Sequence, residues 1–125
     1  MPDFTQLREQ MIERQIVARG ITDPHILAAF RAVPRHFFVA PVNAARAYGD
    51  FPVPIAAGQT ISQPFVVAAM IDASEIKPGD HVLEVGSGSG YATAIIGRIA
   101  ADVTALPKIP ARRGWRRGPP ASSPP

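Results

Sequence analysis

The sequence predicts an α/β fold organised around one βαβ unit. An apolar run, HVLEV at 81–85, is followed at once by the glycine-rich stretch GSGSG at 86–90. A short helical pattern then leads to a second strand candidate, DVTAL at 102–106. Strand, turn, helix and strand in this order connect two parallel strands, and 125 residues are enough for the core of one small domain.

The N-terminal segment predicts an amphipathic helix. Asp3 stands three residues before Gln6, the spacing of a capping box. Apolar side chains then recur at helical spacing until Gly20, a residue that favours helix C-termini. They are Phe4, Leu7, Met11, Ile12 and Ile16. A helix is therefore expected from about residue 4 to Gly20.

Two further helices are predicted before the βαβ unit. Asp23 and Pro24 form an N-cap and first-turn pair, and the helix that they begin is expected to end at Pro34. Residues 48–59 contain too much proline and glycine for a regular element and predict a loop with a short extended piece at 53–55. After it, Ser62 is expected to cap a third helix with Pro64 in its first turn.

The βαβ unit follows a turn at 77–80. The run HVLEV is apolar enough to predict a strand buried on both faces. A fourth helix is expected from about residue 91 to residue 99, before the second strand. Three histidines are spread singly along the chain without the spacing of a metal site.

The charge is distributed unevenly. Of 13 basic residues, five lie between Leu106 and Pro125, which leaves eight against ten acidic residues in 1–105, a net charge of −2. Residues 106–125 are rich in Pro, Arg, Gly and Ser without apolar periodicity, so they predict a disordered tail after a domain at 1–105. Such a tail binds phosphate backbones nonspecifically and indicates no specific nucleic-acid function.

The composition excludes several other classes. No cysteine is present, so disulfides and thiolate metal sites are excluded and a reducing compartment is expected. The longest purely apolar run, FVVAAMI, is far too short to cross a bilayer, and the N-terminus has no apolar signal region. These features predict a cytoplasmic protein with no membrane partner.

The glycine turn has the pattern acidic-x-GxGxG, with Glu84 as the acidic residue. A dinucleotide-binding fingerprint reads GxGxxG and would need a glycine where this chain has Tyr91. Glycines at such a turn let a ligand approach the backbone amides. The other interpretation is a turn that merely connects strand and helix.

Four segments resemble one enzyme family. They are AVPRHFFV from Ala32, AYGDFPVPI from Ala47, GQTISQPFVVAAM from Gly58 and VLEVGSGSGYATAII from Val82. In this order they resemble the protein-L-isoaspartate O-methyltransferases, which repair damaged proteins. The resemblance implies an incomplete class I methyltransferase (Rossmann-like) fold, S-adenosyl-L-methionine as cofactor, isoaspartyl-containing proteins or peptides as substrates, and a monomer.

The resemblance also implies roles for individual residues. Ser62 would be the catalytic serine that orients the substrate carboxylate, although Ser62 taken without the family segment is better explained as a helix N-cap. Glu84 would accept from the cofactor ammonium or fix the turn. The remaining cofactor-binding residues implied are Gln59, Thr60, Ile61, Gly86, Ser87, Gly88, Ser89 and Gly90.

The family pattern stops near residue 105. An acidic residue that holds the cofactor ribose is expected roughly 20 residues past the turn, but Pro107 stands there and no acid follows it up to Pro125. We therefore expect a truncated or frameshifted form that is inactive, with marginal stability. The alternative function is a non-enzymatic remnant whose basic tail binds anionic partners nonspecifically.

Overall fold

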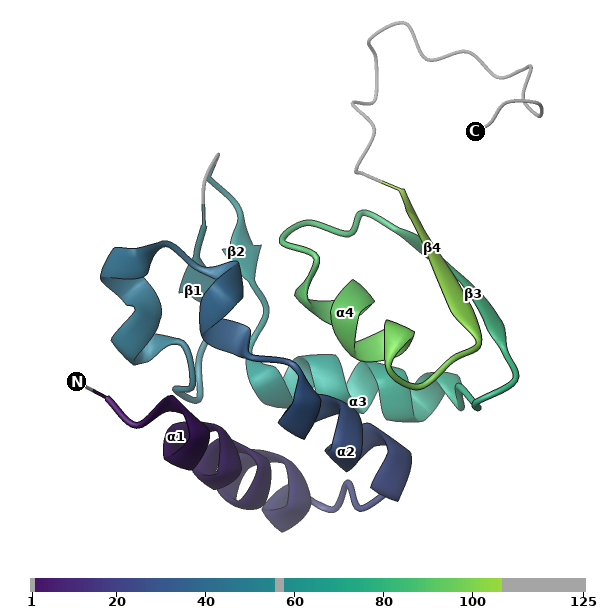
Figure 1. The fold of residues 1–125 in the computed structure, drawn as a ribbon, viewed down its shortest axis with the longest axis horizontal. Coiled ribbons are helices and arrows are strands. Elements are labelled where there is room, and N and C mark those ends of the chain that lie inside the picture. Colours follow the sequence, from purple (N-terminus) through teal and green to yellow (C-terminus); the bar gives the residue numbers. More distant parts are fainter. Residues whose placement is uncertain (1, 56–57, 107–125) are drawn as a thin grey trace, which may run out of the picture.

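The computed structural model describes residues 2–55 and 58–106. In these residues the α-helices and strands follow one another in the order α1-α2-β1-β2-α3-β3-α4-β4. Figure 1 shows the two-stranded parallel sheet at one end and a small hairpin near the other. The helices are α1 Phe4–Met11, α2 Pro24–Ala32, α3 Pro64–Ser74 and α4 Tyr91–Gly97. The strands are β1 Val53–Pro54, β2 Thr60–Ile61, β3 His81–Val85 and β4 Asp102–Leu106.

The first predicted helix forms, in three consecutive pieces. Asp3 caps it, because its Oδ1 accepts from the Gln6 amide at 3.0 Å. α1 continues as a π-helical turn, η1 Ile12–Ile16, and a 3₁₀ turn, η2 Val17–Arg19. It ends as expected at Gly20, whose φ of 99° suits a residue without Cβ. In the apolar stripe, Met11, Ile12 and Ile16 are buried, whereas Phe4 and Leu7 are partly buried against the core.

The second predicted helix is also confirmed. The Asp23 side chain accepts from the His25 amide at 2.8 Å, and Pro24 is the first helical residue of α2. Its buried face contains Phe30, which meets the ring of Tyr91 edge-on at 6.1 Å between centroids. This contact joins α2 to the start of α4.

Two 3₁₀ turns that the sequence did not predict follow α2. They are η3 Arg35–Phe38 and η4 Pro41–Arg46, too short for a periodic signal. η3 places His36 in a cluster with the N-terminal helix, since its ring stacks on Phe4 at 3.9 Å between centroids. The His36 Nδ1 lies 2.9 Å from the Tyr48 hydroxyl, which accepts from Arg8 Nη1 at 3.1 Å.

This cluster predicts a pH-dependent stability. Partial burial, and then the charge of Arg8, lower the pKa of His36 from its ordinary value of 6.5. The folded state therefore binds fewer protons at His36 than the unfolded state, and the free energy of unfolding is expected to fall as the pH falls below about 6.5. Urea unfolding at a series of pH values measures it. His36→Gln should remove this component, and exposed His25→Gln should retain it; equal slopes in wild type and His36→Gln would contradict the assignment.

The expected loop at 48–59 contains one strand of a hairpin. The extended piece forms as β1, which pairs antiparallel with β2 in the register Val53↔Ile61 and Pro54↔Thr60. The β2 strand was not predicted, because two residues carry no alternation pattern. This pairing fixes the position of the QTIS segment, residues 59–62, which is called the serine segment below.

The third helix forms with a different N-terminus from the one predicted. Gln63, not Ser62, stands at the N-cap position, and no side chain caps the helix. Pro64 is the first helical residue, as expected. Because proline has no amide hydrogen, one of the donors that a cap would satisfy is already absent. The Ser62 hydroxyl is thus not used as a cap.

The βαβ unit is confirmed, but its strand is not buried on both faces. β3 and β4 pair in parallel, from His81↔Asp102 to Val85↔Leu106. Leu83 and Val85 are 63% and 67% exposed, whereas Val82 packs against the core. The reason is that β3 belongs to a two-stranded sheet and only one of its faces is covered. Helix α4 ends at Gly97, two residues before the predicted end.

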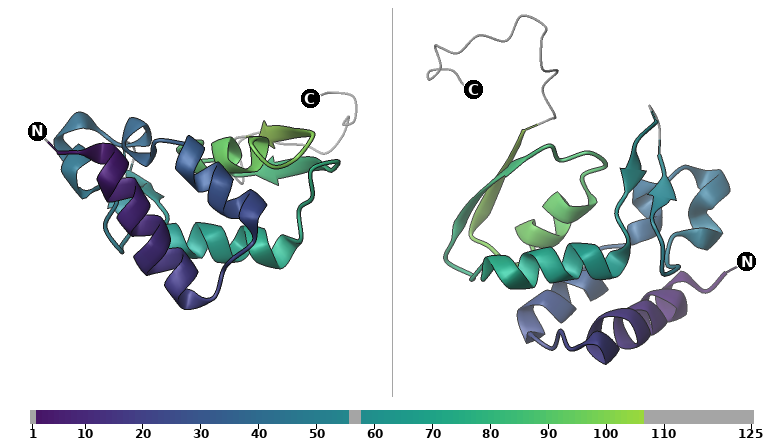
Figure 2. Two further views of the ribbon diagram at one scale, coloured as in Figure 1. Left: turned by 60° about the horizontal axis from the view of Figure 1, so that its bottom comes forward. Right: turned by 180° about the vertical axis from the view of Figure 1, so that it is seen from behind.

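The core lies between α1, α2, α3 and α4. In the right-hand view of Figure 2, α3 crosses beneath the sheet and α4, and α1 and α2 lie below α3. Its buried members include Met11, Phe30, Ile71, Tyr91 and Ile95.

The predicted tail begins one residue too early. Leu106, which the prediction assigned to the tail, is the last residue of β4, and the predicted disorder of 107–125 lies outside the described residues. No helix in the described ranges has the length and apolar character needed to cross a bilayer.

Candidate functional site

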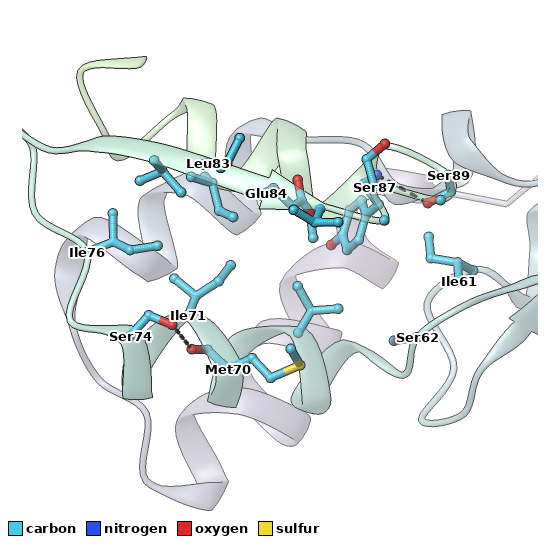
Figure 3. A pocket seen from close by; sticks show the side chains of 18 of the residues that line it. Ile61, Ser62, Met70, Ile71, Ser74, Ile76, Leu83, Glu84, Ser87 and Ser89 are labelled. Carbon is cyan, nitrogen blue, oxygen red and sulfur yellow. Dashed lines mark hydrogen bonds between the residues drawn. The ribbon is translucent and has the colours of Figure 1, made fainter. Parts of the chain in front are cut away.

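A cavity of about 750 Å³ opens between the hairpin, helix α3, strand β3 and the glycine turn. The β3–α4 loop and β2 lie side by side in both Figure 1 and Figure 2, although they are distant in the sequence. Figure 3 shows Ile61 and Ser62 on one side of the cavity, Ser87 and Ser89 above it, and Met70 and Ser74 of α3 below.

Most of the site residues implied by the sequence line this one cavity. They are Thr60, Ile61, Ser62, Glu84, Gly86, Ser87, Gly88 and Ser89. Gln59 and Gly90 do not line it. The Gln59 carbonyl instead accepts from the Ile55 amide at 2.8 Å and closes the hairpin, and Gly90 is the N-cap residue of α4. Both therefore support the cavity wall from outside.

The glycine turn is held by the end of β4. Gly86, Gly88 and Gly90 have φ values of 79°, 56° and 87°, a region that favours glycine. The amides of Gly86 and Ser87 both donate to the Leu106 carbonyl, at 2.8 and 3.2 Å. Within the described part of the chain the amides of Gly88 and Ser89 have no such acceptor, so these two are the donors open to a ligand.

Glu84 is half-buried at the floor of the turn. Its Oε1 accepts a hydrogen bond from the Thr93 hydroxyl on α4. This contact fixes the carboxylate against the helix that follows the turn. Glu84 therefore adds a carboxylate with a fixed orientation to the cavity wall beside the glycine turn, whereas the other acidic residue of the lining, Asp80, lies before β3.

Ser62 lies exposed at the cavity rim, between β2 and α3. Its hydroxyl makes no hydrogen bond to the residues that the structure describes, and so is free to donate to a ligand in the cavity. Its backbone is restrained instead, because the Ser62 carbonyl accepts from Nη2 of Arg35 at 2.8 Å.

Sequence reasoning missed the α3 side of the cavity. Met70, Ile71 and Ser74 line it, as do Leu83 and Tyr91. Met70 is 64% exposed on a helix that is apolar nearly all round, so helical periodicity does not distinguish this face from the core face. The exposure of the Met70 side chain is the signal that this face borders a cavity, and that exposure is known only from the structure. In residues 2–55 and 58–106 no three His, Asp or Glu side chains are placed to hold a metal ion.

Comparison with known proteins points to one enzyme family. The family model described as protein-L-isoaspartate(D-aspartate) O-methyltransferase matches residues 6–109. A protein-L-isoaspartate O-methyltransferase of Methylorubrum extorquens is 54% identical over 106 residues, covering 85% of this chain and 46% of the relative. One from Trichlorobacter lovleyi is 49% identical over 109 residues, covering 87% and 50%.

A solved structure supports the same relationship. A putative protein-L-isoaspartate O-methyltransferase of Plasmodium falciparum, in complex with S-adenosyl-L-homocysteine, superposes with a TM-score of 0.66 at 27% identity. The match covers 87% of this chain and 50% of that one. The predicted Rossmann-like methyltransferase fold is thereby confirmed for the described residues.

The chain spans about half the length of the curated relatives that it matches, between 43% and 50% in three of them. Within that half, the match extends through the hairpin, the serine segment, the glycine turn and β4. The family model also covers far more than half of this chain. The chain therefore belongs to the protein-L-isoaspartate(D-aspartate) O-methyltransferase family.

Proposed function

We propose that the protein acts in S-adenosyl-L-methionine-dependent methylation of L-isoaspartyl carboxylates in damaged proteins. In this proposal the chain forms the part of the site that holds the methionine end of the cofactor and the substrate carboxylate. One observation carries the proposal. A single cavity brings Ser62 together with the glycine turn at Gly86 to Ser89, the two segments that the family resemblance connects with substrate and cofactor.

The residues present fit the methionine end of the cofactor. The free amides of Gly88 and Ser89 suit a carboxylate, and the oriented carboxylate of Glu84 suits an ammonium group. Thr60 and Ile61 form the wall beside them. Gln59 contributes through the hairpin that it closes, and Gly90 through the start of α4.

The bound cofactor would supply an activated methyl group on a sulfonium. The protein's own residues have to orient the carboxylate and exclude water, because a reaction that neutralises two opposite charges is favoured in a water-poor site. The Ser62 hydroxyl donates to one carboxylate oxygen and leaves the other directed into the cavity. No general base is required, since a carboxylate is already ionised near neutral pH. Positioning of this kind contributes up to ~7–11 kcal/mol in favourable cases.

We further propose that the 125-residue chain by itself transfers methyl groups at most very slowly. Residues 107–125 contain no acid that would hold the ribose hydroxyls, so the cofactor is held at one end only. We also propose that the protein acts in the cytoplasm, since a chain without cysteine needs no oxidising compartment for its folding. We also propose that the protein works as a monomer without a nucleic-acid or membrane partner.

Calorimetric titration with S-adenosyl-L-homocysteine tests the binding site, and radiolabelled methyl transfer to an isoaspartyl peptide tests turnover. We expect saturable binding of the cofactor product and methyl transfer no higher than the blank. Absence of binding at millimolar ligand would overturn the assignment of the cavity. Transfer clearly above the blank would instead overturn the proposed inactivity and leave the site assignment standing.

Ser62→Ala is expected to weaken binding of an isoaspartyl peptide by at least about tenfold, because a hydrogen bond to a charged group contributes about 1.5–3 kcal/mol. Affinity for S-adenosyl-L-homocysteine should stay unchanged. NMR titration measures both. Ser74→Ala is the matched control, because Ser74 lines the same cavity but its hydroxyl donates to the Met70 carbonyl at 2.7 Å. Equal peptide affinity in the two variants would refute the role of Ser62.

A further inference from the structure

Arg35 is a fully buried cation between Ser62 and the start of α4. Its side chain is 0% exposed, and in the described part of the chain no carboxylate lies against it. Burial is the main cause that lowers the pKa of Arg35 from its ordinary value of 12.5. An arginine remains charged despite such a shift. Burying a charge without a counter-ion is costly, so its hydrogen bonds have to compensate for the lost water.

Those hydrogen bonds go to two separate backbone segments. Nε donates to the carbonyl of Ala47, in the segment that follows η4. Nη2 donates to the Ser62 carbonyl at 2.8 Å. The two acceptors are far apart in the sequence, and the planar fork of one guanidinium holds both. Nη1 has no partner in the described residues.

The third contact reaches the glycine turn. The guanidinium carbon of Arg35 lies 5.0 Å from the centre of the Tyr91 ring, within the range of a cation–π interaction. Tyr91 is 1% exposed and is the first residue of α4, directly after Gly90. Arg35 therefore contacts the residue that follows the turn on one side and the serine segment on the other.

The β1–β2 pairing restrains the serine segment, residues 59–62, up to Ile61, but Ser62 itself lies beyond it. Ser62 is exposed, and the N-terminus of α3 beside it has no side-chain cap. The neighbouring Gln63 is tied through its side chain to Asp50 at 2.7 Å, which restrains the helix start and not the Ser62 carbonyl. The hydrogen bond from Arg35 is thus the direct restraint on the backbone orientation of Ser62.

We propose that Arg35 is a positioning residue, which sets the distance and orientation between the Ser62 segment and the glycine turn by holding the Ser62 carbonyl and the Tyr91 ring at once. This inference rests on the proposed function of the cavity. Arg35 touches neither cofactor nor substrate, and it acts through the two segments that do. A structural role alone would lower stability without changing the affinity of the molecules that remain folded.

The first test uses the unmodified chain. An NMR experiment that detects scalar coupling across hydrogen bonds should connect the Arg35 guanidinium nitrogen with the Ser62 carbonyl carbon. This measurement needs no ligand, so it remains informative even if the proposed function fails. Absence of the coupling, with rapid exchange of the Arg35 side-chain protons, would overturn the proposal.

The second test uses variants. Arg35→Met removes every hydrogen-bond donor, so the affinity for an isoaspartyl peptide, per folded molecule, should fall by at least about tenfold. Arg35→Lys keeps the charge but loses the planar guanidinium, so the affinity should fall by less. The Ser62 carbonyl and Tyr91 ring signals should shift in both. Arg31→Met is the matched control, because Arg31 is half-exposed and pairs with Glu9 at 3.0 Å. Ile12→Val controls for a general loss of stability, since Ile12 is a core residue that does not line the cavity.

Each outcome decides the inference. Loss of affinity in the Arg35 variants, with wild-type affinity in Arg31→Met and Ile12→Val, supports it. Unchanged Ser62 and Tyr91 signals with wild-type affinity in Arg35→Lys overturns it. If Arg35→Met does not fold, Arg35→Lys and the wild-type coupling decide. If the wild-type chain binds neither the peptide nor S-adenosyl-L-homocysteine, the proposed function fails. The scalar coupling in the wild type and the signal shifts in Arg35→Lys then still decide whether Arg35 positions Ser62.

Discussion

Gly86→Val is expected to lower the affinity for S-adenosyl-L-homocysteine by about tenfold. Gly86 has a φ of 79°, and a Cβ built there meets no atom within 4 Å. The free-energy cost of a valine at position 86 therefore comes from its backbone conformation and not from contacts with neighbouring atoms. A side chain at positive φ costs about 1–2 kcal/mol, and a β-branched one costs more. The turn should relieve this strain by shifting, which moves the amides of Gly88 and Ser89 away from the ligand.

Gly79→Val is the matched control for this prediction. Gly79 lies in the turn before β3, has no positive φ, and also has open space around a built Cβ. Its replacement by valine should change the affinity by less than about twofold. Calorimetric titration of both variants gives the comparison, with thermal unfolding recorded in parallel. Wild-type affinity in Gly86→Val would mean that the turn does not hold the cofactor through its backbone.

Phe30→Ala is expected to destabilise the chain by about 3–5 kcal/mol. Phe30 is 0% exposed and packs edge-on against Tyr91, so its ring joins α2 to the helix that follows the glycine turn. Removal leaves a cavity at this junction. A small domain has only about 5–15 kcal/mol of stability in total, and here one face of β3 exposes Leu83 and Val85. We therefore expect Phe30→Ala to be largely unfolded at 25 °C.

Phe37→Ala provides the control within the same region. Phe37 belongs to η3 and is 74% exposed, so its truncation should change the free energy of unfolding by less than about 0.5 kcal/mol. Circular dichroism and urea titration measure both variants. A Phe30→Ala protein as stable as Phe37→Ala would show that the junction between α2 and α4 is not part of the cooperative core.

The site was predictable to the extent that it depends on local chemistry. The glycine turn could be located because three closely spaced glycines after an apolar strand have few other uses, and their positive φ values agree. Ser62 could be located only through the family resemblance, and the expectation that it also caps α3 was wrong. The contribution of Met70 could not be predicted, because an all-round apolar helix does not reveal which face borders a cavity.

The sequence by itself determined the order of the four α-helices, the end of the first helix at Gly20, the start of α2 at Pro24 and the parallel βαβ unit. These follow from local spacing, capping and turn preferences, which depend on neighbours in the chain. Only the tertiary structure decided that the Leu106 carbonyl holds the turn, that β2 brings Ser62 beside it, and that Arg35 joins both. Such contacts depend on how residues distant in sequence meet. The same reason explains why Leu83 and Val85 are exposed although they are apolar. Whether a strand residue is buried depends on the elements that cover it and not on its own hydrophobicity.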